Sequence, residues 1–267
     1  MTSAADRRSP THQSTTARGL APICFAHRGA RGHAPENTLL AFDLAFDLGA
    51  EGIECDAQLS RDGRLVIIHD GTVNRTTNGR GAVRDLTLAE MQALDAGRGQ
   101  RIPTLEETLS LIRARRGLIN IEVKAESDDE AVETAQAIAA LLGAIADDDP
   151  LRERILVSSF NHPAIPTIKR LLPWAQTGAL YGGRAWTRNA MIDRALTLGA
   201  DAIHPHPRIL SQETVRAAHA AGLRVNVWTA NLWPTIRQLI AWEVDGVFSD
   251  FPERVIITRR LGGEPVE

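Results

Sequence analysis

Short apolar runs alternate with longer stretches of helical periodicity from about residue 22 onward. Eight strand positions are expected, the second with a hairpin partner, at the segments ICFAH, GIECDAQL with LVIIH, LINIEVK, RILVSSF, QTGALY, DAIHP, RVNVWTA and DGVFSDF. The helices between them have legible ends, for example residues 39–48, 129–142 and 211–221, each followed by a glycine. This β-then-α order predicts a parallel sheet with right-handed crossovers, and eight units favour a closed (β/α)8 barrel over an open sheet.

One connection is much longer than the others. It runs from His69 to a helix that begins near Thr104, is rich in Gly, Thr, Asn and Arg, and holds a short helical stretch at residues 88–94. Loops of this length in compact domains are usually functional caps or disordered segments. Thr104 and Glu107 have the spacing of a capping box, which marks the start of the following helix.

Composition narrows the class of protein. The 267 residues are 43% apolar, with 30 basic and 33 acidic side chains and a formal charge of −3, which is typical of a globular chain and argues against a nucleic-acid partner.

No apolar run reaches the roughly 18–20 residues that cross a bilayer, and the N-terminus lacks the apolar segment of a signal peptide, so a cytoplasmic protein without a membrane span is expected. Residues 1–21 are polar and aperiodic and are expected to form a disordered leader. The two cysteines, Cys24 and Cys55, are expected to be buried free thiols.

Charged side chains occur at the strand ends, where barrel enzymes carry their chemistry. Alternation along a strand places Glu54 and Asp56 on one face, and Glu122 and Lys124 on one face of the next barrel strand. Because the apolar neighbours must face the helices, the three carboxylates should converge at the mouth of the barrel. Such a cluster needs a positive partner, and its oxygen ligands favour Mg²⁺ or Ca²⁺ over zinc. The alternative is a structural salt network with Arg28 and Lys124.

His69 is placed by a predicted hairpin. Asp62 and Gly63 have the signature of a two-residue loop between the strand-like runs AQLSR and RLVII. In that register His69 lies opposite Asp56, with both side chains in the barrel mouth. A third loop residue or a bulge would turn His69 to the other face.

His27 precedes Arg28 and Gly29 at the end of the first strand. Two imidazoles, a divalent ion and the permanent cations Arg28 and Lys124 form a set that suits cleavage of a phosphoester. The cations would hold the non-bridging oxygens, the ion would neutralise charge, and an imidazole would protonate the leaving alkoxide.

An ordered series of motifs runs over residues 22–254. It comprises HRGARGHAPENTLLAF, the Glu54-x-Asp56 pair, VIIHD, RTTNGRG, IPTLEE, IEVK, VWTAN and GVFSDFP. This series resembles the glycerophosphodiester phosphodiesterase family. The resemblance implies a single (β/α)8 barrel domain at residues 22–260, with a cap insertion after the second strand, here residues 71–103.

The resemblance also implies an activity and a site. Members of the family split a glycerophosphodiester into glycerol 3-phosphate and an alcohol, which implies a part in lipid and glycerol metabolism. The expected course is attack by the neighbouring glycerol hydroxyl to give a cyclic phosphate, then hydrolysis, with the order in which the histidines act left open. The matching residues are the metal ligands Glu54, Asp56 and Glu122, the catalytic pair His27 and His69, and the phosphate contacts Arg28 and Lys124.

Other residues near these motifs have two readings. Trp228 and Phe160 are candidate apolar walls for the substrate carbons, a role that the resemblance supports for Trp228, with packing in the core as the alternative. Glu36 and Asn37 open the first helix, where either helix capping or support of the site is expected, with direct contact with the metal as the less favoured alternative.

Two other functions remain as alternatives. A related barrel phospholipase acting on lipid or lysolipid headgroups would also use paired histidines, but should carry an apolar rim, which the aromatic content of 4% disfavours. A catalytically silent barrel that serves as a binding protein would normally have lost a histidine or a metal ligand. The sequence leaves open the headgroup, the choice of ion, the oligomeric state and the roles of His204 and His206.

Overall fold

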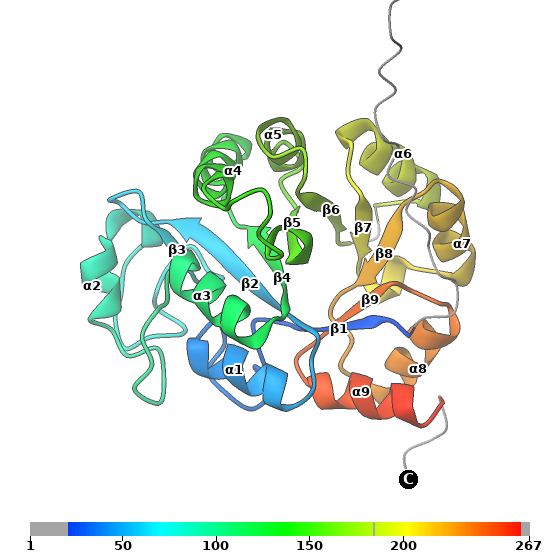
Figure 1. Cartoon of the computed structure of the whole chain (residues 1–267), viewed down its shortest axis with the longest axis horizontal. Coiled ribbons are helices and arrows are strands. Elements are labelled where there is room, and N and C mark those ends of the chain that lie inside the picture. The colour runs from blue at the N-terminus through cyan, green and yellow to red at the C-terminus, as the bar shows by residue number, and fades with distance from the viewer. Residues whose placement is uncertain (1–20, 184, 263–267) are drawn as a thin grey trace, which may run out of the picture.

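Eight parallel strands close into a barrel within the residues that the computed structural model describes, 21–183 and 185–262. Hydrogen bonding runs in order from β1 through β2, β4, β5, β6, β7, β8 and β9 and returns to β1, which confirms the predicted closure (Figure 1). The barrel strands are β1 (Ile23–Ala26), β2 (Gly52–Leu59), β4 (Leu118–Val123), β5 (Ile155–Ser159), β6 (Gln176–Tyr181), β7 (Ala202–Pro205), β8 (Arg224–Val227) and β9 (Gly246–Ser249). Residues 1–20 of the expected leader lie outside the described residues.

Helices follow the strands and surround the barrel (Figure 1). The helices are α1 (Leu39–Asp47), α2 (Leu88–Gln92), α3 (Leu105–Arg115), α4 (Asp128–Gly143), α5 (Ala164–Leu171), α6 (Arg188–Leu198), α7 (Gln212–Ala220), α8 (Trp233–Ala241) and α9 (Pro252–Arg260), with short 3-10 turns at Val83–Asp85, Arg152–Arg154 and Pro207–Ile209. The predicted helix ends agree with these bounds to within one residue at α1, α4 and α7.

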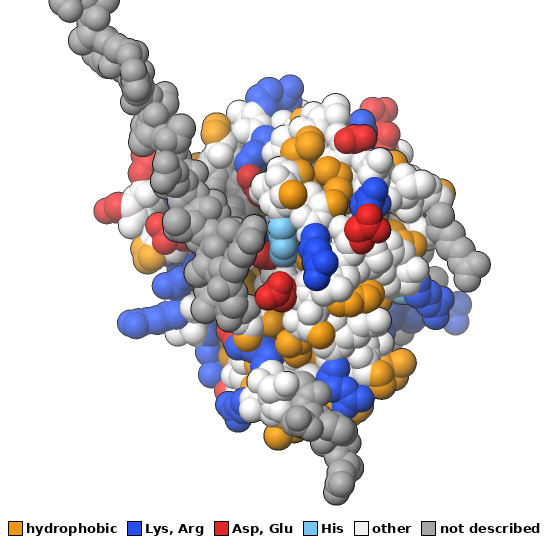
Figure 2. Space-filling model, turned by 90° about the vertical axis from the view of Figure 1, so that its right-hand side faces the viewer, with side chains coloured by type: hydrophobic (Ala, Val, Ile, Leu, Met, Phe, Trp, Pro, Cys, Tyr) orange, Lys and Arg blue, Asp and Glu red, His pale blue; other side chains and the backbone are white. Residues whose placement is uncertain are grey.

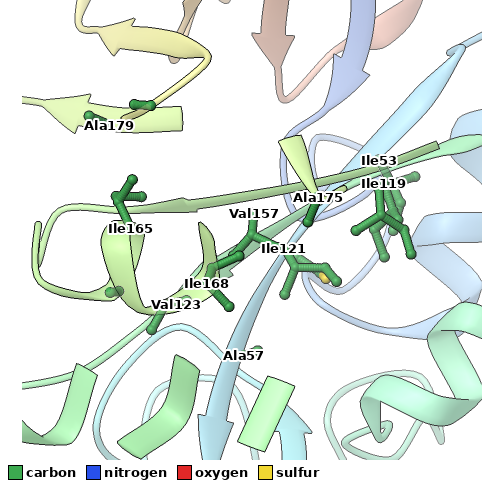
Figure 3. Packing of buried hydrophobic residues seen from close by; sticks show 14 of the residues in the cluster. Ile53, Ala57, Ile119, Ile121, Val123, Val157, Ile165, Ile168, Ala175 and Ala179 are labelled. Atoms are coloured by element: carbon green, nitrogen blue, oxygen red, sulfur yellow. The ribbon is translucent and has the colours of Figure 1, made fainter. Parts of the chain in front are cut away.

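The apolar positions of the strands face the helices. Ile53 and Cys55 of β2 and Ile121 of β4 are fully buried members of the core between the barrel and its helices. Figure 3 shows this layer, in which the strand residues Ile121 and Val157 lie near Ile168 of α5. With the apolar side chains on the outside of the barrel, the alternate positions of the same strands face its interior.

The hairpin after β2 has a longer turn than the sequence predicted. β3 (Leu65–Ile67) runs antiparallel to β2, and the Ser60 N–H donates to the Arg64 carbonyl at 2.9 Å, so residues 61–63 form the turn. Gly63 takes a φ of +70° there, and Ser60 Oγ donates to Asp62 Oδ1 at 2.6 Å. The predicted two-residue loop is therefore wrong. The turn has three residues, and Gly63 is its left-handed last residue.

The cap insertion has an apolar core of its own, distinct from the barrel core. This cluster, hereafter the cap cluster, consists of the buried residues Val66, Ile68, Val73, Val83, Met91, Ala96 and Ile102. Capping boxes start the two neighbouring helices: Thr87 with Glu90 at α2, and Thr104 with Glu107 at α3 as predicted. The insertion is thus an ordered unit that packs on β3 rather than a disordered loop.

Acidic, basic and apolar side chains are interspersed on the face of the molecule that carries α7 and α8, as Figure 2 shows. Within residues 21–183 and 185–262, no helix combines the length and the apolar character needed to cross a bilayer.

Candidate active site

Three carboxylates meet at one mouth of the barrel. Glu54 and Asp56 come from β2 and Glu122 from β4, and Asp56 is the direct partner of Glu122 in the parallel register. One oxygen from each of the three lies within 4.8 Å of the others, and all three residues are buried. This is the convergence that strand alternation predicts, and it offers three oxygen ligands to one cation.

Burial and mutual repulsion oppose the negative charge of the three carboxylates. Burial, reinforced by Asp56 and Glu122, raises the pKa of Glu54, and burial raises the pKa of Glu122 by more than Lys124 lowers it. Burial opposes the charged form of Asp56 too, but Lys124 and Arg28 lower its pKa. Glu54 Oε1 and Asp56 Oδ1 are buried without a hydrogen-bond partner among the described residues. A divalent ion relieves both the repulsion and the unpaired oxygens, so the residues present fit such an ion.

Two cations border the cluster. Lys124 Nζ donates to Glu122 Oε1 at 2.7 Å and lies 3.6 Å from Asp56 Oδ1. Arg28 has a left-handed φ of 54°, its backbone N–H donates to Glu54 Oε2 at 2.8 Å, and its Nε lies 3.2 Å from Asp56 Oδ2. The salt network that the sequence left as an alternative is therefore present, but two cations cannot neutralise three carboxylates. The salt network is therefore compatible with a bound divalent ion and does not take its place.

His27 follows β1 and pairs with an aspartate from the other end of the chain. Its Nδ1 lies 2.7 Å from Oδ1 of Asp250, which follows β9, the strand beside β1. Asn231 donates to Asp250 Oδ2 at 2.7 Å and accepts from its backbone N–H at 2.8 Å. Burial opposes the charge of Asp250, but the hydrogen bond from His27 lowers its pKa, so Nδ1 is the donor and Nε2 is left for a substrate. Burial lowers the pKa of His27 and favours the neutral imidazole.

In the sequence, Asp250 was noted only as part of the motif GVFSDFP, without a role at the site. The available signal was its position: a polar residue at the end of the last strand lies beside the end of the first strand in any closed barrel.

His69 lies just beyond the end of β3. Its expected pairing with Asp56 is wrong, because the longer turn puts Ile68 there, with its N–H donating to the Asp56 carbonyl at 2.8 Å. The Gln58 side chain donates to the carbonyls of Ile68, His69 and Asp70 at 2.8, 3.0 and 2.9 Å and so bends the chain past the strand end. Beyond the end of β3, the alternation of side chains along a strand no longer determines the direction of His69. The His69 side chain lies close enough to Asp56 to lower the pKa of that carboxyl.

Asp70 binds His69 as Asp250 binds His27. His69 Nδ1 lies 2.7 Å from Asp70 Oδ1. Hydrogen bonds from Arg75 and from His69 hold the pKa of Asp70 well below its usual range, so the carboxylate accepts and Nδ1 donates. Burial lowers the pKa of His69 as it does that of His27.

Asn37 supports the carboxylate cluster from the β1–α1 loop. It is buried, and its Nδ2 donates to Asp56 Oδ2 at 2.7 Å. The N-cap of α1 is Thr38, whose side chain accepts from the Ala41 N–H. Of the two roles expected for Asn37, support of the site is therefore the one that its contacts match.

An aromatic wall of Phe160, Trp228 and His206 follows β5, β8 and β7. The Phe160 and Trp228 rings meet edge to face with centroids 5.0 Å apart, and His206 packs on Trp228 at 5.5 Å. Lys124 Nζ lies 5.7 Å from the Phe160 centroid, which joins the aromatic wall to the cationic side of the site. Phe160 is 41% exposed, so it offers apolar surface rather than core packing.

His204 is enclosed in the barrel interior. Its ring lies against Gly178, where a Cβ would come within 2.3 Å of Nε2, and that nitrogen lies 3.0 Å from Asn226 Nδ2. Burial lowers the pKa of His204 to about 3, so it is neutral. Its carbonyl accepts from Trp228 Nε1 at 2.6 Å, which makes it a support for the aromatic wall.

The chain matches the model of the glycerophosphoryl diester phosphodiesterase family over residues 27–254, which include every residue of the site described above. The chain belongs to this family. It is 37% identical over 251 residues to a glycerophosphodiester phosphodiesterase of Caldanaerobacter subterraneus subsp. tengcongensis, covering 90% of this chain and 99% of that one. It is 35% identical over 245 residues to a glycerophosphodiester phosphodiesterase of Bacillus altitudinis, covering 88% and 97%.

Solved structures of other phosphodiesterases share the fold. An Oleispira antarctica phosphodiesterase, in complex with the product sn-glycerol-3-phosphate, superposes with a TM-score of 0.81 at 33% identity, covering 90% of this chain and 97% of that one. A glycerophosphodiester phosphodiesterase from Agrobacterium tumefaciens superposes with a TM-score of 0.73 at 28% identity, covering 88% and 99%. The resemblance inferred from the motifs is confirmed.

Proposed function

We propose that this protein hydrolyses glycerophosphodiesters to glycerol 3-phosphate and an alcohol. The observation that carries the proposal is the arrangement at the barrel mouth, where two His–Asp pairs accompany a buried carboxylate cluster bordered by two cations. The Oleispira antarctica relative, in complex with sn-glycerol-3-phosphate, supports the same product.

Glu54, Asp56 and Glu122 would hold a divalent ion, Mg²⁺ or Ca²⁺, because hard cations prefer all-oxygen ligands. When bound, this ion neutralises charge on the phosphodiester and makes the phosphorus a better electrophile.

Arg28 and Lys124 would bind the non-bridging phosphate oxygens. Both side chains are largely buried and already held by carboxylates, Lys124 by Glu122 and Arg28 by Glu36 at 2.9 Å. Little side-chain conformational freedom is then left to be lost when the phosphate binds. Trp228 and Phe160 would cover the glycerol carbons with apolar surface.

His27 and His69 would move the protons. In the first step one neutral imidazole takes the proton of the glycerol hydroxyl next to the phosphate, and the other, which starts as the imidazolium, protonates the departing alkoxide, leaving a cyclic phosphate. In the second step the roles are exchanged, so that water adds and the ring opens. Each histidine acts once as base and once as acid, and the lowered pKa values keep neutral imidazole available as the base.

The test is incubation with glycerophosphocholine, glycerophosphoethanolamine and a lysophospholipid, each with and without a chelator. We expect glycerol 3-phosphate from the first two substrates, and its loss with the chelator. Lysophosphatidate from the lysophospholipid alone would favour the barrel phospholipase, and no product from any substrate would favour the silent barrel.

A cytoplasmic location and a part in lipid and glycerol metabolism complete the proposal. Both cysteines, Cys24 and Cys55, are free and buried, which suits a reducing compartment. Cell fractionation with an antibody to the chain tests the location.

A further inference from the structure

Arg75 of the cap insertion grips two carboxylates that belong to different parts of the site. Its Nε and Nη2 donate to Asp70 Oδ2 and Oδ1 at 2.7 and 3.0 Å. Its Nη1 and Nη2 donate to Glu36 Oε2 and Oε1 at 3.0 and 2.8 Å. A planar guanidinium can hold two carboxylates in fixed directions, whereas a lysine ammonium acts as a point charge.

The backbone that carries Arg75 is fixed by the cap insertion. Val73 is buried in the cap cluster, and its N–H donates to the Gly81 carbonyl at 3.0 Å. Its carbonyl accepts from the Thr77 N–H at 3.1 Å, and Asn74 Oδ1 accepts from the Gly81 N–H at 2.9 Å. The position of the guanidinium therefore depends on the folded and docked cap insertion.

Asp70 joins Arg75 to His69. Asp70 Oδ1 accepts from His69 Nδ1 at 2.7 Å, and among the described contacts His69 and Arg75 are the partners of this carboxylate. The Asp70 side chain is 31% exposed, so packing alone does not hold it. Removing Arg75 would let the carboxylate rotate into water and release the imidazole.

Glu36 anchors Arg75 to the barrel. The Glu36 side chain is 11% exposed and also accepts from Arg28 Nη1 at 2.9 Å. Burial opposes its charge, but hydrogen bonds led by that from Arg75 lower its pKa to about 2, so it remains an anion. The anchor thus lies on the β1–α1 loop and the clamped Asp70 lies beyond β3.

We propose that Arg75 is a positioning residue that orients His69 by clamping Asp70 against its Nδ1, with Glu36 as the fixed support. The inference rests on the proposed function, because it requires His69 to move a proton. Through this one side chain, docking of the cap insertion contributes to turnover and not only to covering the site.

The test compares Arg75→Ala and Arg75→Lys with Arg84→Ala in the full chain. Arg84 is a matched control, since it also extends from the cap insertion to two carboxylates, Glu133 at 2.7 Å and Glu130 at 3.6 Å on α4. Its side chain is 36% exposed, against 46% for Arg75.

We expect both Arg75 variants to lower kcat for glycerophosphocholine by about 10–100-fold, as is usual when the partner behind a functional histidine is lost, with KM changed by less than about threefold. Arg84→Ala should stay within about twofold of wild type.

Asp70→Ala separates the clamp from a mere attachment of the cap insertion. Because Arg75 acts through Asp70, adding Arg75→Ala to Asp70→Ala should lower kcat by less than about twofold more. A purely structural role would instead multiply the two losses and would appear in Arg84→Ala as well. Either that result or an Arg75→Ala kcat within about threefold of wild type overturns the inference.

Two controls separate a loss of turnover from misfolding of a variant and from failure of the proposed function. Circular dichroism and the Tm establish that each variant is folded, and Arg75→Met, which keeps the aliphatic stem, takes the place of a variant that is not. The wild-type protein is assayed first, so a failure of the proposed function shows as absence of glycerol 3-phosphate before any variant is compared.

Discussion

Both histidines at the barrel mouth use Nδ1 to bind an aspartate, and each aspartate is itself held by another side chain. Asn231 holds Asp250 behind His27, and Arg75 holds Asp70 behind His69. A donor bond from Nδ1 sets the tautomer and the ring direction, and leaves Nε2 to exchange a proton with substrate. At this scale the site holds two similar His–Asp pairs with different origins in the chain.

Replacing either His27 or His69 by Ala should lower kcat by about 10²–10⁴-fold with little change in KM, because proton transfer is lost in the transition state while the phosphate contacts remain. Steady-state kinetics on metal-saturated, folded protein measures this. His33→Ala is the control, since His33 pairs with Glu253 at the surface, 3.2 Å away, and should leave turnover unchanged. Wild-type turnover in both variants would disprove acid–base catalysis by this pair.

His204 should make the stability of the protein depend on pH. Burial lowers its pKa from the usual 6.5 to about 3, so below pH 6.5 the unfolded chain binds a proton that the folded chain refuses. Stability from this residue is therefore complete above pH 6.5 and is lost as the pH falls. Between pH 7 and pH 5 the loss is about 2 kcal/mol of unfolding free energy. Urea unfolding of wild type and His204→Gln checks it: the difference between them should shrink by this amount toward pH 5, and a constant difference would contradict it.

The cap insertion is the element whose order matters most for the site. It supplies Arg75 from a backbone held by its own core, and capping boxes at Thr87 and Thr104 start the helices on either side of its last loop. A small core of this kind stabilises an element only marginally. A substitution in the cap cluster should therefore loosen the cap insertion without unfolding the barrel.

Met91→Ala should loosen the cap insertion. Met91 is fully buried in the cap cluster, and truncating a buried Met costs about 2–5 kcal/mol. We expect cleavage within residues 71–103 by dilute protease to become about tenfold faster or more, because the open form is more populated, together with a lower kcat. Leu196→Ala on α6 serves as control, since Leu196 is 50% exposed. Equal cleavage rates in Met91→Ala and wild type would show that the cap cluster does not order the insertion.

At the scale of the whole molecule, the closed barrel assembles the site from both ends of the chain. His27 and Asp250 are 223 residues apart and meet because β9 hydrogen-bonds to β1. Within the barrel, the direct pairing of β2 with β4 holds Glu54, Asp56 and Glu122 together in the interior, where their mutual repulsion works against the fold.

A divalent cation should therefore stabilise the whole protein. Binding to the folded state at about 100 times Kd adds about 2.7 kcal/mol, which for a chain of this size raises the Tm by about 5–10 °C. Calorimetry with Mg²⁺ or Ca²⁺, against monovalent salt of equal ionic strength, measures the shift. Glu122→Gln should abolish most of it, and an equal shift in that variant would place the ion elsewhere.

Much of this site was predictable because it depends on local geometry. The alternation of side chains along a strand puts Glu54 and Asp56 on one face, and the same rule applied to β4 brings Glu122 beside them. The spacing of Thr104 and Glu107 predicted the start of α3 for a similar reason, since a capping box needs only four consecutive residues.

The order of the elements, the faces of the strands and the candidate ligands could be read from the amino-acid sequence, because they follow from periodicities of the backbone over a few residues. The turn before β3, the partner of His27 and the clamp of Arg75 on Asp70 and Glu36 became known from the folded molecule. A turn length reflects competition between conformations of similar energy, whereas the contacts of His27 with Asp250 and of Arg75 with Glu36 join segments far apart in the chain. None of the three follows from the local spacing of residues, so they appear once the barrel has closed and the cap insertion has docked.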